Sequence, residues 1–408
     1  MFVPDKQDRM VHFGRLPWFV QHNVLAALQD LPSLHSLHNA IPEVAAFLHR
    51  NNDLFAQIVD AIIENPARER GLLPHVQRAV RQLAIIWTEQ SRKQSKEDNT
   101  QERDANVLDN LRYVAEPYAT LPTPILRILS RSTPAAVLCR LLALMARLRC
   151  LIHASFHAMV GKSLQLQIEH LPEKTAYANI RGAGLGHRPQ GIPCTPTDVG
   201  PLTWIEEQRL LGSFLCIVIY YELRKMYVHF SVTSARSETV QISSHVTVEE
   251  FWGKILRTRN NGQREQISTI LHWLDGQAGG RENIPSWLSS GPDLPEYRYC
   301  CPSYTTLNDE QWAEEERYIS EAYTSHGALC LWQSRVAPIS PLRCVDYAVF
   351  RPYGLIFWTV IRMDALGFRK GFGVGHRMWF AMSFVLTEND WEQLVTRQLD
   401  RSFDPRIL

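Results

Sequence analysis

The chain has 408 residues, of which 45% are hydrophobic, and its 43 Lys and Arg residues are balanced by 42 Asp and Glu residues. This apolar content can build a sizeable core, so we expect a folded chain of two or three domains. The net charge of +1 at pH 7 offers no strongly basic surface, and nucleic acid is therefore not an expected partner.

Targeting and membrane segments are not indicated either. Residues 1–10 lack the positively charged and apolar regions of a signal peptide. The longest nearly uncharged apolar run, Leu210 to Tyr221, is about half of the ~20 residues that a bilayer requires. We expect no membrane partner and a cytoplasmic or nuclear location.

The eight cysteines are sparse, and no CxxC pair is present to build a thiolate metal site or a thioredoxin-like centre. Several cysteines lie in apolar stretches, where a free thiol behaves as a small hydrophobe. The sequence therefore predicts structural cysteines in a reducing compartment, and it implies no cofactor.

Residues 10–65 predict a module of three or four short helices. Apolar residues recur at helical spacing over 16–31, with Pro17 suited to the first turn. Pro32 and Ser33 interrupt this pattern before a second stripe over 34–41, and Pro42 permits the next start. Asn51-Asn52 then separates a third stripe from a fourth, over 54–62.

Residues 66–105 predict a helix followed by a charged linker, because no apolar residue occurs from Gln90 to Asp104. Residues 106–408 predict a larger, irregular helical body. Its apolar periodicity over 124–168 indicates buried helices, and the five glycines and four prolines of 180–201 indicate turns and an extended loop.

Helical patterns resume at 202–228, and a partial alternation of Val, Thr, Ser and Ile over 232–246 suggests one small hairpin. Further helices are expected at 249–274, 309–324 and 388–399. The predicted fold class is mainly α.

Catalytic motifs are weak. Gly161-Lys162-Ser163 resembles the end of a phosphate-binding loop, but Phe156 stands where that loop needs its first glycine. The alternating glycines at 182–186 and 371–375 lack the full GxGxxG spacing and are interpreted as turns.

Histidine pairs are the candidate metal ligands. His153 and His157 stand four apart on an expected helix, a spacing that places two imidazoles on one face. No glutamate of a zinc-protease motif lies between them and no third ligand is evident, so polar or packed histidines are expected and no metal site is predicted. His35 and His38 carry a weaker signal still.

The stretch Leu16-Pro17-Trp18-Phe19-Val20, together with the apolar residues that follow up to Ile41-Pro42, resembles an F-box. In that family a leucine-proline pair opens a short three-helix module that docks on the Skp adaptor of a cullin-based SCF ubiquitin ligase. The continuation through Phe47, Asn51, Ile58 and Ile62 is similar to the extended module of many fungal F-box-like proteins.

Two later segments resemble the same fungal proteins. Pro201-Leu202-Thr203, with Glu206, Arg209, Leu210 and Phe214, is similar to a helix in the middle of those chains. Residues 350–358, FRPYGLIFW, with Arg362 and 366–368, are similar to their C-terminal Gly-Tyr-Val-Phe-Trp element.

The resemblance implies a non-enzymatic adaptor that holds a Skp-type adaptor, and through it a cullin, and recruits an unknown protein client through its C-terminal body. Two departures favour a second hypothesis, because Phe19 replaces the usual acidic residue and Gln21 a usual apolar one. In that hypothesis the chain is an F-box-derived accessory or regulatory protein without a ligase role, for example in a fungal secondary-metabolite pathway. An enzyme of unknown chemistry, with its site in the C-terminal body, is the third.

Docking needs apolar side chains that remain after the module has built its own core, since anchors desolvated at the interface supply most of the affinity. The expected partner-binding residues are Leu16, Pro17, Trp18, Val20, Val24, Leu28, Leu34 and Leu37. The alternative is that Trp18 and Phe19 cover the larger body. In that body Tyr353, Phe357 and Trp358 are candidates for client contact, with a C-terminal core as the alternative.

Overall fold

The computed structural model of the chain is predominantly helical, which confirms the mainly α class. The residues it describes are 13–28, 30–64, 71–95, 129–172, 188, 190–226, 230–233, 239–242, 246–255, 261–294, 304–320, 325–337, 340–369 and 376–394. The chain divides into two compact units, the first formed by 1–149 with 225–227 and the second by 150–224 with 228–408. The first unit thus extends beyond the expected boundary at 105. Of the expected linker, 90–95 are helical rather than a flexible linker, and 96–105 lie outside the described residues.

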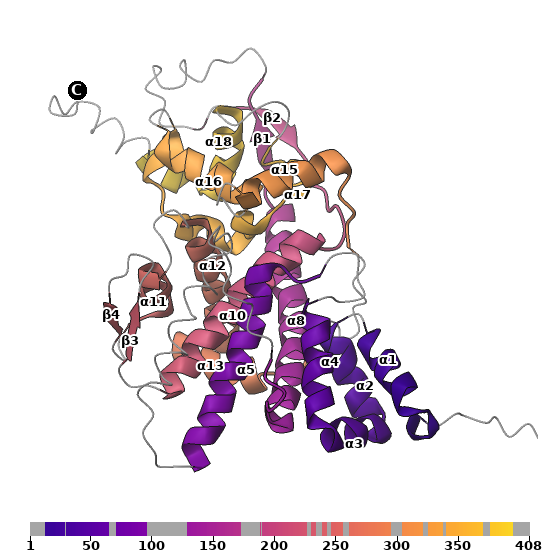
Figure 1. Ribbon diagram of the computed structural model, residues 1–408. Coiled ribbons are helices and arrows are strands. Elements are labelled where there is room, and N and C mark those ends of the chain that lie inside the picture. The colour runs from indigo at the N-terminus through magenta and orange to yellow at the C-terminus, as the bar shows by residue number, and fades with distance from the viewer. Residues whose placement is uncertain are drawn as a thin grey trace, which may run out of the picture. The chain divides into compact units, whose positions relative to one another are not determined.

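The first unit begins with four short helices, drawn in indigo in Figure 1. After the 3-10 turn η1 (Phe13–Arg15) they are α1 (Trp18–Ala26), α2 (Leu31–Ala40), α3 (Pro42–Arg50) and α4 (Asn52–Glu64). They lie where the apolar stripes predict them, because proline stands in the first turn of α2 and of α3. Asp30 caps α2, its carboxylate accepting a hydrogen bond from the Ser33 amide at 2.7 Å.

Two long helices complete the first unit: α5 (Pro74–Ser95) and the first half of α8 (Ala135–Leu164), whose second half belongs to the second unit. The core of the short helices consists of Leu25, Leu31, Leu34, Val44, Leu48, Phe55, Ile58, Val59, Ile62 and Ile63, each at most 2% exposed. Helices of this length are not stable in isolation, so burial of their apolar faces is the main source of their stability.

Buried polar contacts join α4 to the rest of the first unit. Asp60 accepts hydrogen bonds from Arg81 Nε at 2.8 Å and from the Leu129 amide at 3.2 Å. Asn52 Nδ2 donates to the carbonyl of Thr133 at 2.9 Å. The four short helices are therefore one part of a larger helical unit.

The second unit is longer and more irregular. Its helices are α10 (Trp204–Met226), α11 (Val248–Ile255), α12 (Asn261–Ala278), α13 (Ile284–Ser290), α15 (Asp309–Ser320), α16 (His326–Val336), α17 (Val360–Ala365), α18 (His376–Met382) and a helix over 388–394. The 3-10 turns are η2 (Arg281–Asn283), η3 (Pro341–Cys344), η4 (Tyr347–Tyr353), η5 (Leu355–Phe357) and η6 (Ser383–Val385). The strands are β1 (Ile168–His170), β2 (Ile192–Cys194), β3 (Phe230–Thr233) and β4 (Thr239–Ile242).

Helix α10 is the centre of the second unit, since its side chains are buried on every face from Ile205 to Tyr220. This explains the apolar run at 210–221, because a helix surrounded by protein needs no polar stripe. Among the described residues, no helix is both long and apolar enough to cross a membrane.

The strands differ in how well they were predicted. β3 and β4 form the expected antiparallel hairpin, with Val232 opposite Val240. β1 and β2 also pair antiparallel, with Glu169 opposite Pro193, although the sequence indicated only an extended loop at 180–201.

The helical structure expected over 249–274 is present as two helices: α11 ends at Ile255 and α12 begins at Asn261. Asn261 and Gly262 disfavour a helix interior but are tolerated at its start.

Candidate functional site

Helix α1 carries the most exposed large hydrophobic side chains among the described residues of the first unit. Trp18 is 69% exposed, Phe19 52% and Val24 43%, whereas Gln21 and Leu25 form the buried face. The rings of Trp18 and Phe19 meet edge to face with centroids 6.3 Å apart. The aromatic pair therefore does not build the core of the module, and it remains available to a partner.

The expected partner-binding residues divide into three groups. Pro17, Trp18 and Val24 are exposed. Half-buried are Leu16, Val20, Leu28 and Leu37. Leu34 is fully buried, because it faces inward from α2. We define the candidate docking surface as Pro17, Trp18, Phe19, Val20 and Val24, which are contributed by α1 and the residue before it.

The buried side chain of Gln21 holds the backbone turn that precedes this surface. Its side-chain Nε2 donates to the carbonyls of Phe13 at 2.9 Å and Leu16 at 3.0 Å, so it fixes the turn that precedes α1. Pro17 cannot donate a backbone hydrogen bond, and the side-chain amide supplies a donor at this helix start. The unusual glutamine is thus a structural residue rather than part of the exposed surface.

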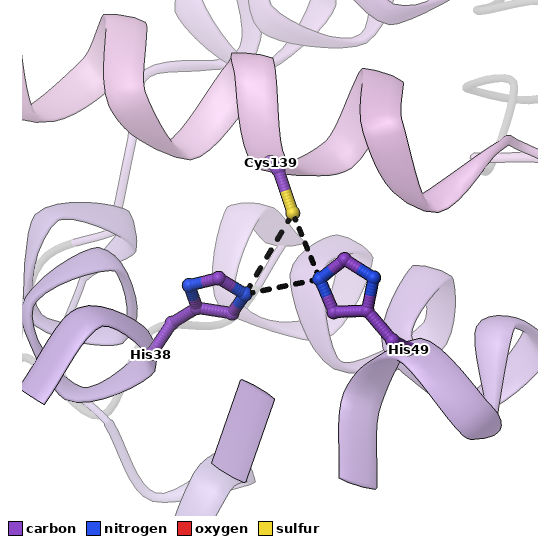
Figure 2. Close-up of side chains that lie close together, drawn as sticks. All are labelled: His38, His49 and Cys139. Carbon is purple, nitrogen blue, oxygen red and sulfur yellow. Dashed lines mark hydrogen bonds between the residues drawn. The ribbon is translucent and has the colours of Figure 1, made fainter. Parts of the chain in front are cut away.

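A cluster of possible metal ligands lies elsewhere in the first unit (Figure 2). His38 of α2, His49 of α3 and Cys139 of α8 place one ligating atom each within 4.8 Å of the others. His38 Nε2 lies 3.3 Å from His49 Nε2, and Cys139 Sγ lies 3.7 and 3.6 Å from these two atoms. Burial raises the pKa of the Cys139 thiol, which therefore carries its proton at neutral pH when nothing is bound.

The candidate client-binding residues lie mostly inside the second unit. Phe357 and Trp358 are both 0% exposed, and Tyr353 is half-buried. The ring of Trp358 packs edge to face against Phe156 at 5.8 Å, and its indole nitrogen donates to the carbonyl of Tyr353 at 2.9 Å. These contacts correspond to the alternative interpretation, a C-terminal core.

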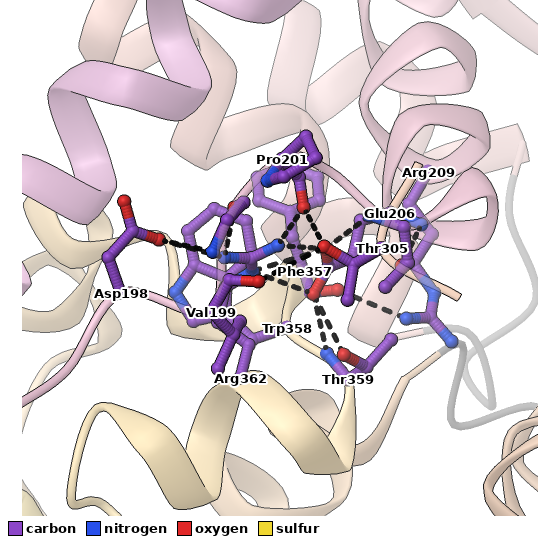
Figure 3. A network of polar contacts seen from close by, with 12 residues as sticks. Asp198, Val199, Pro201, Glu206, Arg209, Thr305, Phe357, Trp358, Thr359 and Arg362 are labelled. Atoms are coloured by element: carbon purple, nitrogen blue, oxygen red, sulfur yellow. Dashed lines mark hydrogen bonds and ion pairs between the residues drawn. The ribbon is translucent and has the colours of Figure 1, made fainter. Parts of the chain in front are cut away.

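A buried polar network surrounds the same segment (Figure 3). Thr203 and Glu206 form a capping box at the start of α10, in which the Thr203 amide donates to Glu206 Oε2 at 3.0 Å and the Glu206 amide donates to Thr203 Oγ1 at 3.3 Å. Glu206 also accepts from the Thr359 amide at 3.0 Å and from Arg362 Nη2 at 3.0 Å. One carboxylate therefore joins the starts of α10 and α17.

The remaining groups of Arg362 are also satisfied. Its Nη2 donates to the carbonyl of Pro201 at 2.8 Å and its Nη1 to that of Gly200 at 3.3 Å. The guanidinium lies 4.6 Å from the ring centroid of Phe156 and 5.6 Å from that of Trp358.

A second ion pair extends the network. Arg209 Nη2 donates to Glu315 Oε2 at 2.5 Å, and Arg209 Nη1 donates to the carbonyl of Phe357 at 3.1 Å.

The pKa values of the two carboxylates, Glu206 and Glu315, shift in opposite directions. Burial acts to raise the pKa of Glu206, but Arg362 and hydrogen bonds from Thr203 and Thr359 lower it below its ordinary value. Burial raises the pKa of Glu315, despite Arg209. The two carboxylates and the two guanidinium groups bind one another and nearby backbone groups, so we interpret the network as structural.

The other motifs that fall on described residues do not form sites. Gly161, Lys162 and Ser163 lie within α8, where a helical backbone cannot curl around a phosphate. His153 is buried and His157 exposed on the same helix, and no third ligating side chain joins them among the described residues. The glycines at 182–186 and 371–375 lie outside the described residues.

Comparison with known proteins gives no relatives: no family model, curated protein or solved structure matches this chain.

Proposed function

We propose that the chain is an F-box-type adaptor that docks on a Skp-type adaptor of an SCF ubiquitin ligase through α1 and recruits a protein client through its second unit. One observation carries the proposal: the aromatic pair Trp18–Phe19 is exposed directly after Leu16-Pro17, where an F-box presents its docking side chains. An exposed aromatic pair beside a proline is costly to leave in water and suits desolvation by a partner.

Contacts between the two later segments of resemblance give further support. Glu206 and Arg209 belong to the helix that is similar to the middle of fungal F-box-like proteins, and Arg362 belongs to the similar C-terminal element. Glu206 pairs with Arg362, and Arg209 donates to the carbonyl of Phe357. A structural dependence of this kind would explain why both segments occur together in one chain.

The two departures from the F-box pattern have different consequences. Gln21 points inward and holds the turn before α1, so it leaves the exposed surface unchanged. Phe19 is exposed and replaces a charge with an aromatic ring at the docking surface. This change favours the second candidate function, an F-box-derived accessory protein whose α1 binds a more apolar partner than a Skp-type adaptor.

A separate apolar pair in the second unit is the best surface for a client. Trp332 is 38% exposed and Val336 46%, and they stand one turn apart on α16. A short apolar segment of a client can cover such a pair. Phe357 and Trp358, being buried, are not part of this surface.

The test is affinity purification of the tagged full-length chain from a fungal host, followed by mass spectrometry. Trp18→Ala removes an exposed indole from the docking surface, and Trp332→Ala is the matched control, because it removes an exposed indole from α16. A Leu16→Ala plus Pro17→Ala double variant tests the turn itself. Circular dichroism of each variant establishes that the chain is folded.

The expected result is recovery of a Skp-type adaptor and a cullin with the native chain and with Trp332→Ala, and their loss with Trp18→Ala and the double variant. Loss of one interface anchor corresponds to at least about 2 kcal/mol, or roughly a 30-fold weaker affinity. Equal recovery by Trp18→Ala would sink the docking surface. A folded native chain that recovers neither protein would favour the accessory function.

A further inference from the structure

We propose that His38, His49 and Cys139 form a zinc-binding site. Zinc in proteins is tetrahedral, with Zn–N distances of about 2.0–2.1 Å and Zn–S distances of about 2.3 Å. Those bond lengths and the tetrahedral angle place two nitrogen ligands ~3.3 Å apart and a nitrogen and a sulfur ligand ~3.6 Å apart. The atoms here are 3.3 Å apart for the nitrogen pair, and 3.6 and 3.7 Å apart for the two nitrogen–sulfur pairs.

The directions of the side chains agree with the distances. Both imidazoles present Nε2, and the Cys139 sulfur points between the two rings (Figure 2). The three ligands come from three different helices, α2, α3 and α8. A soft thiolate with two imidazoles selects zinc over hard cations such as magnesium and calcium.

Asn39 prepares His38 for this role. The side-chain oxygen Oδ1 of Asn39 accepts a hydrogen bond from His38 Nδ1 at 3.1 Å, which leaves the lone pair of His38 Nε2 for the metal. The amide nitrogen of Asn39 donates in turn to His35 Nε2 at 3.1 Å. Partners of this kind are typical of metal-ligating histidines, because they fix the tautomer and the ring orientation.

Ordinary hydrogen bonds explain the cluster less well. With its Nδ1 proton committed to Asn39, neutral His38 offers only an acceptor, and the three converging atoms share at most the thiol proton and one proton of His49. A cation satisfies all three lone pairs at once. His49 is exposed, so water reaches the cluster and can supply the fourth ligand.

Zinc at this position would join α2 and α3 to α8. Cys139 lies 101 residues from His38 and 90 residues from His49 in the chain, so the ligands converge only when the first unit is folded. A ligand that binds only the folded state raises its stability by mass action. We therefore expect zinc to stabilise the first unit, whether or not α1 binds a Skp-type adaptor.

The experiment uses the full-length chain after removal of metal by a chelator. Binding of Zn²⁺ is measured by titration calorimetry, and Co²⁺ is added separately as a spectroscopic probe of thiolate ligation and tetrahedral geometry. Cys139→Ser is compared with Cys150→Ser, which changes a half-buried cysteine of the same helix. His49→Gln, an exposed position, is compared with His157→Gln, also exposed.

We expect one Zn²⁺ per chain, a thiolate-to-cobalt absorption band and a higher melting temperature with zinc. Cys139→Ser and His49→Gln should abolish all three, and both control variants should retain them. Asn39→Ala should weaken zinc binding by about 10- to 100-fold.

Zinc binding by Cys139→Ser with native affinity, or no binding by the native chain, would overturn the site. Binding of Mg²⁺ or Ca²⁺ in preference to zinc under competition would overturn the choice of metal, because a thiolate with two imidazoles should select against hard cations. If Cys139→Ser failed to fold, His49→Gln would decide the question, since its side chain is not part of the core.

Discussion

Arg362 Nη2 lies 3.0 Å from Glu206 Oε2 across 156 residues of sequence, and both side chains are withdrawn from solvent, at 1% and 0% exposure. Neither charge could be buried alone, because an isolated ion in the protein interior costs several kcal/mol. Each charge can therefore be buried only because the other is present. Together the two side chains hold the start of α17 against the start of α10.

Removal of one partner should destabilise the second unit. Arg362→Met keeps much of the side-chain volume but leaves Glu206 without its counter-ion, and we expect the free energy of unfolding to fall by about 3–5 kcal/mol. Urea unfolding followed by circular dichroism measures this change. Arg281→Met is the control, because its ion pair with Glu249 is half exposed and should contribute at most about 1 kcal/mol.

A double variant separates the attraction from the cost of burial. Glu206→Met combined with Arg362→Met removes both charges, so we expect it to be more stable than Arg362→Met alone. A double variant less stable than the single one would show that the hydrogen bonds to Thr203 and Thr359 outweigh the burial of the charge.

The role of Gln21 in holding the turn before α1 can be tested on the chain alone, without a binding partner. Gln21→Leu places an apolar side chain on the buried face of α1, but it leaves the carbonyls of Phe13 and Leu16 without this donor. We expect a loss of about 1–3 kcal/mol in local stability, seen as faster hydrogen exchange over residues 16–21. Asn23→Ala, an exposed change on the same helix, should leave exchange there unchanged. Slower exchange in Gln21→Leu would contradict the assigned role.

Stability should fall in mild acid because of His326. Burial, with Arg369, Arg209 and Arg317 nearby, lowers its pKa from 6.5 to about 3. Below pH 6.5 the unfolded chain gains a proton that the folded chain does not, so the free energy of unfolding decreases as pH falls toward 3, by up to about 1.4 kcal/mol per pH unit.

The variant His326→Gln should flatten this part of the pH profile, measured by urea unfolding at several pH values. His157→Gln, at an exposed position, should not. His75, whose pKa is lowered to about 4 mainly by burial, should contribute to the slope that remains. An unchanged profile in His326→Gln would refute the assignment.

Two glycines in helices should respond in opposite ways to substitution by alanine. At Gly327 of α16 an added methyl group would overlap the carbonyl oxygen of Leu355, so Gly327→Ala must move η5 and should destabilise the second unit by several kcal/mol. At Gly161 of α8, apart from the adjacent residues and the backbone of the helix itself, no described atom lies within 4 Å of an added methyl group, and Gly161→Ala should stabilise the chain by about 0.5–1 kcal/mol. Thermal unfolding of both variants measures the contrast.

The first four helices could be predicted because their signals are local. Pro32 and Pro42 stand in first turns, and Asn51-Asn52 separates α3 from α4. The pairing of β1 with β2 could not be predicted, since three-residue strands carry no clear alternation and their register depends on partners far apart in sequence.

The two candidate sites also differ in whether the sequence could predict them. The apolar excess at Trp18 is visible in the sequence, because it lies beside Leu16-Pro17, and the exposure of this side chain agrees with that interpretation. The approach of Cys139 to His38 and His49 leaves no local trace. Only the packing of α8 against α2 and α3 brings the three side chains together, so the sequence indicated a structural cysteine and a weak histidine pair.

The burial of α10 has a consequence for the order of events during synthesis. This helix leaves the ribosome well before Arg362, which must neutralise Glu206, and before the segment that carries Phe357 and Trp358 has been made. Trp252 and Trp273, which contact α10, are made in the interval, but the C-terminal partners of its first turn are still missing. The second unit should therefore complete its folding only after residues up to Arg362 have been released, and the nascent protein should depend on chaperones over that interval.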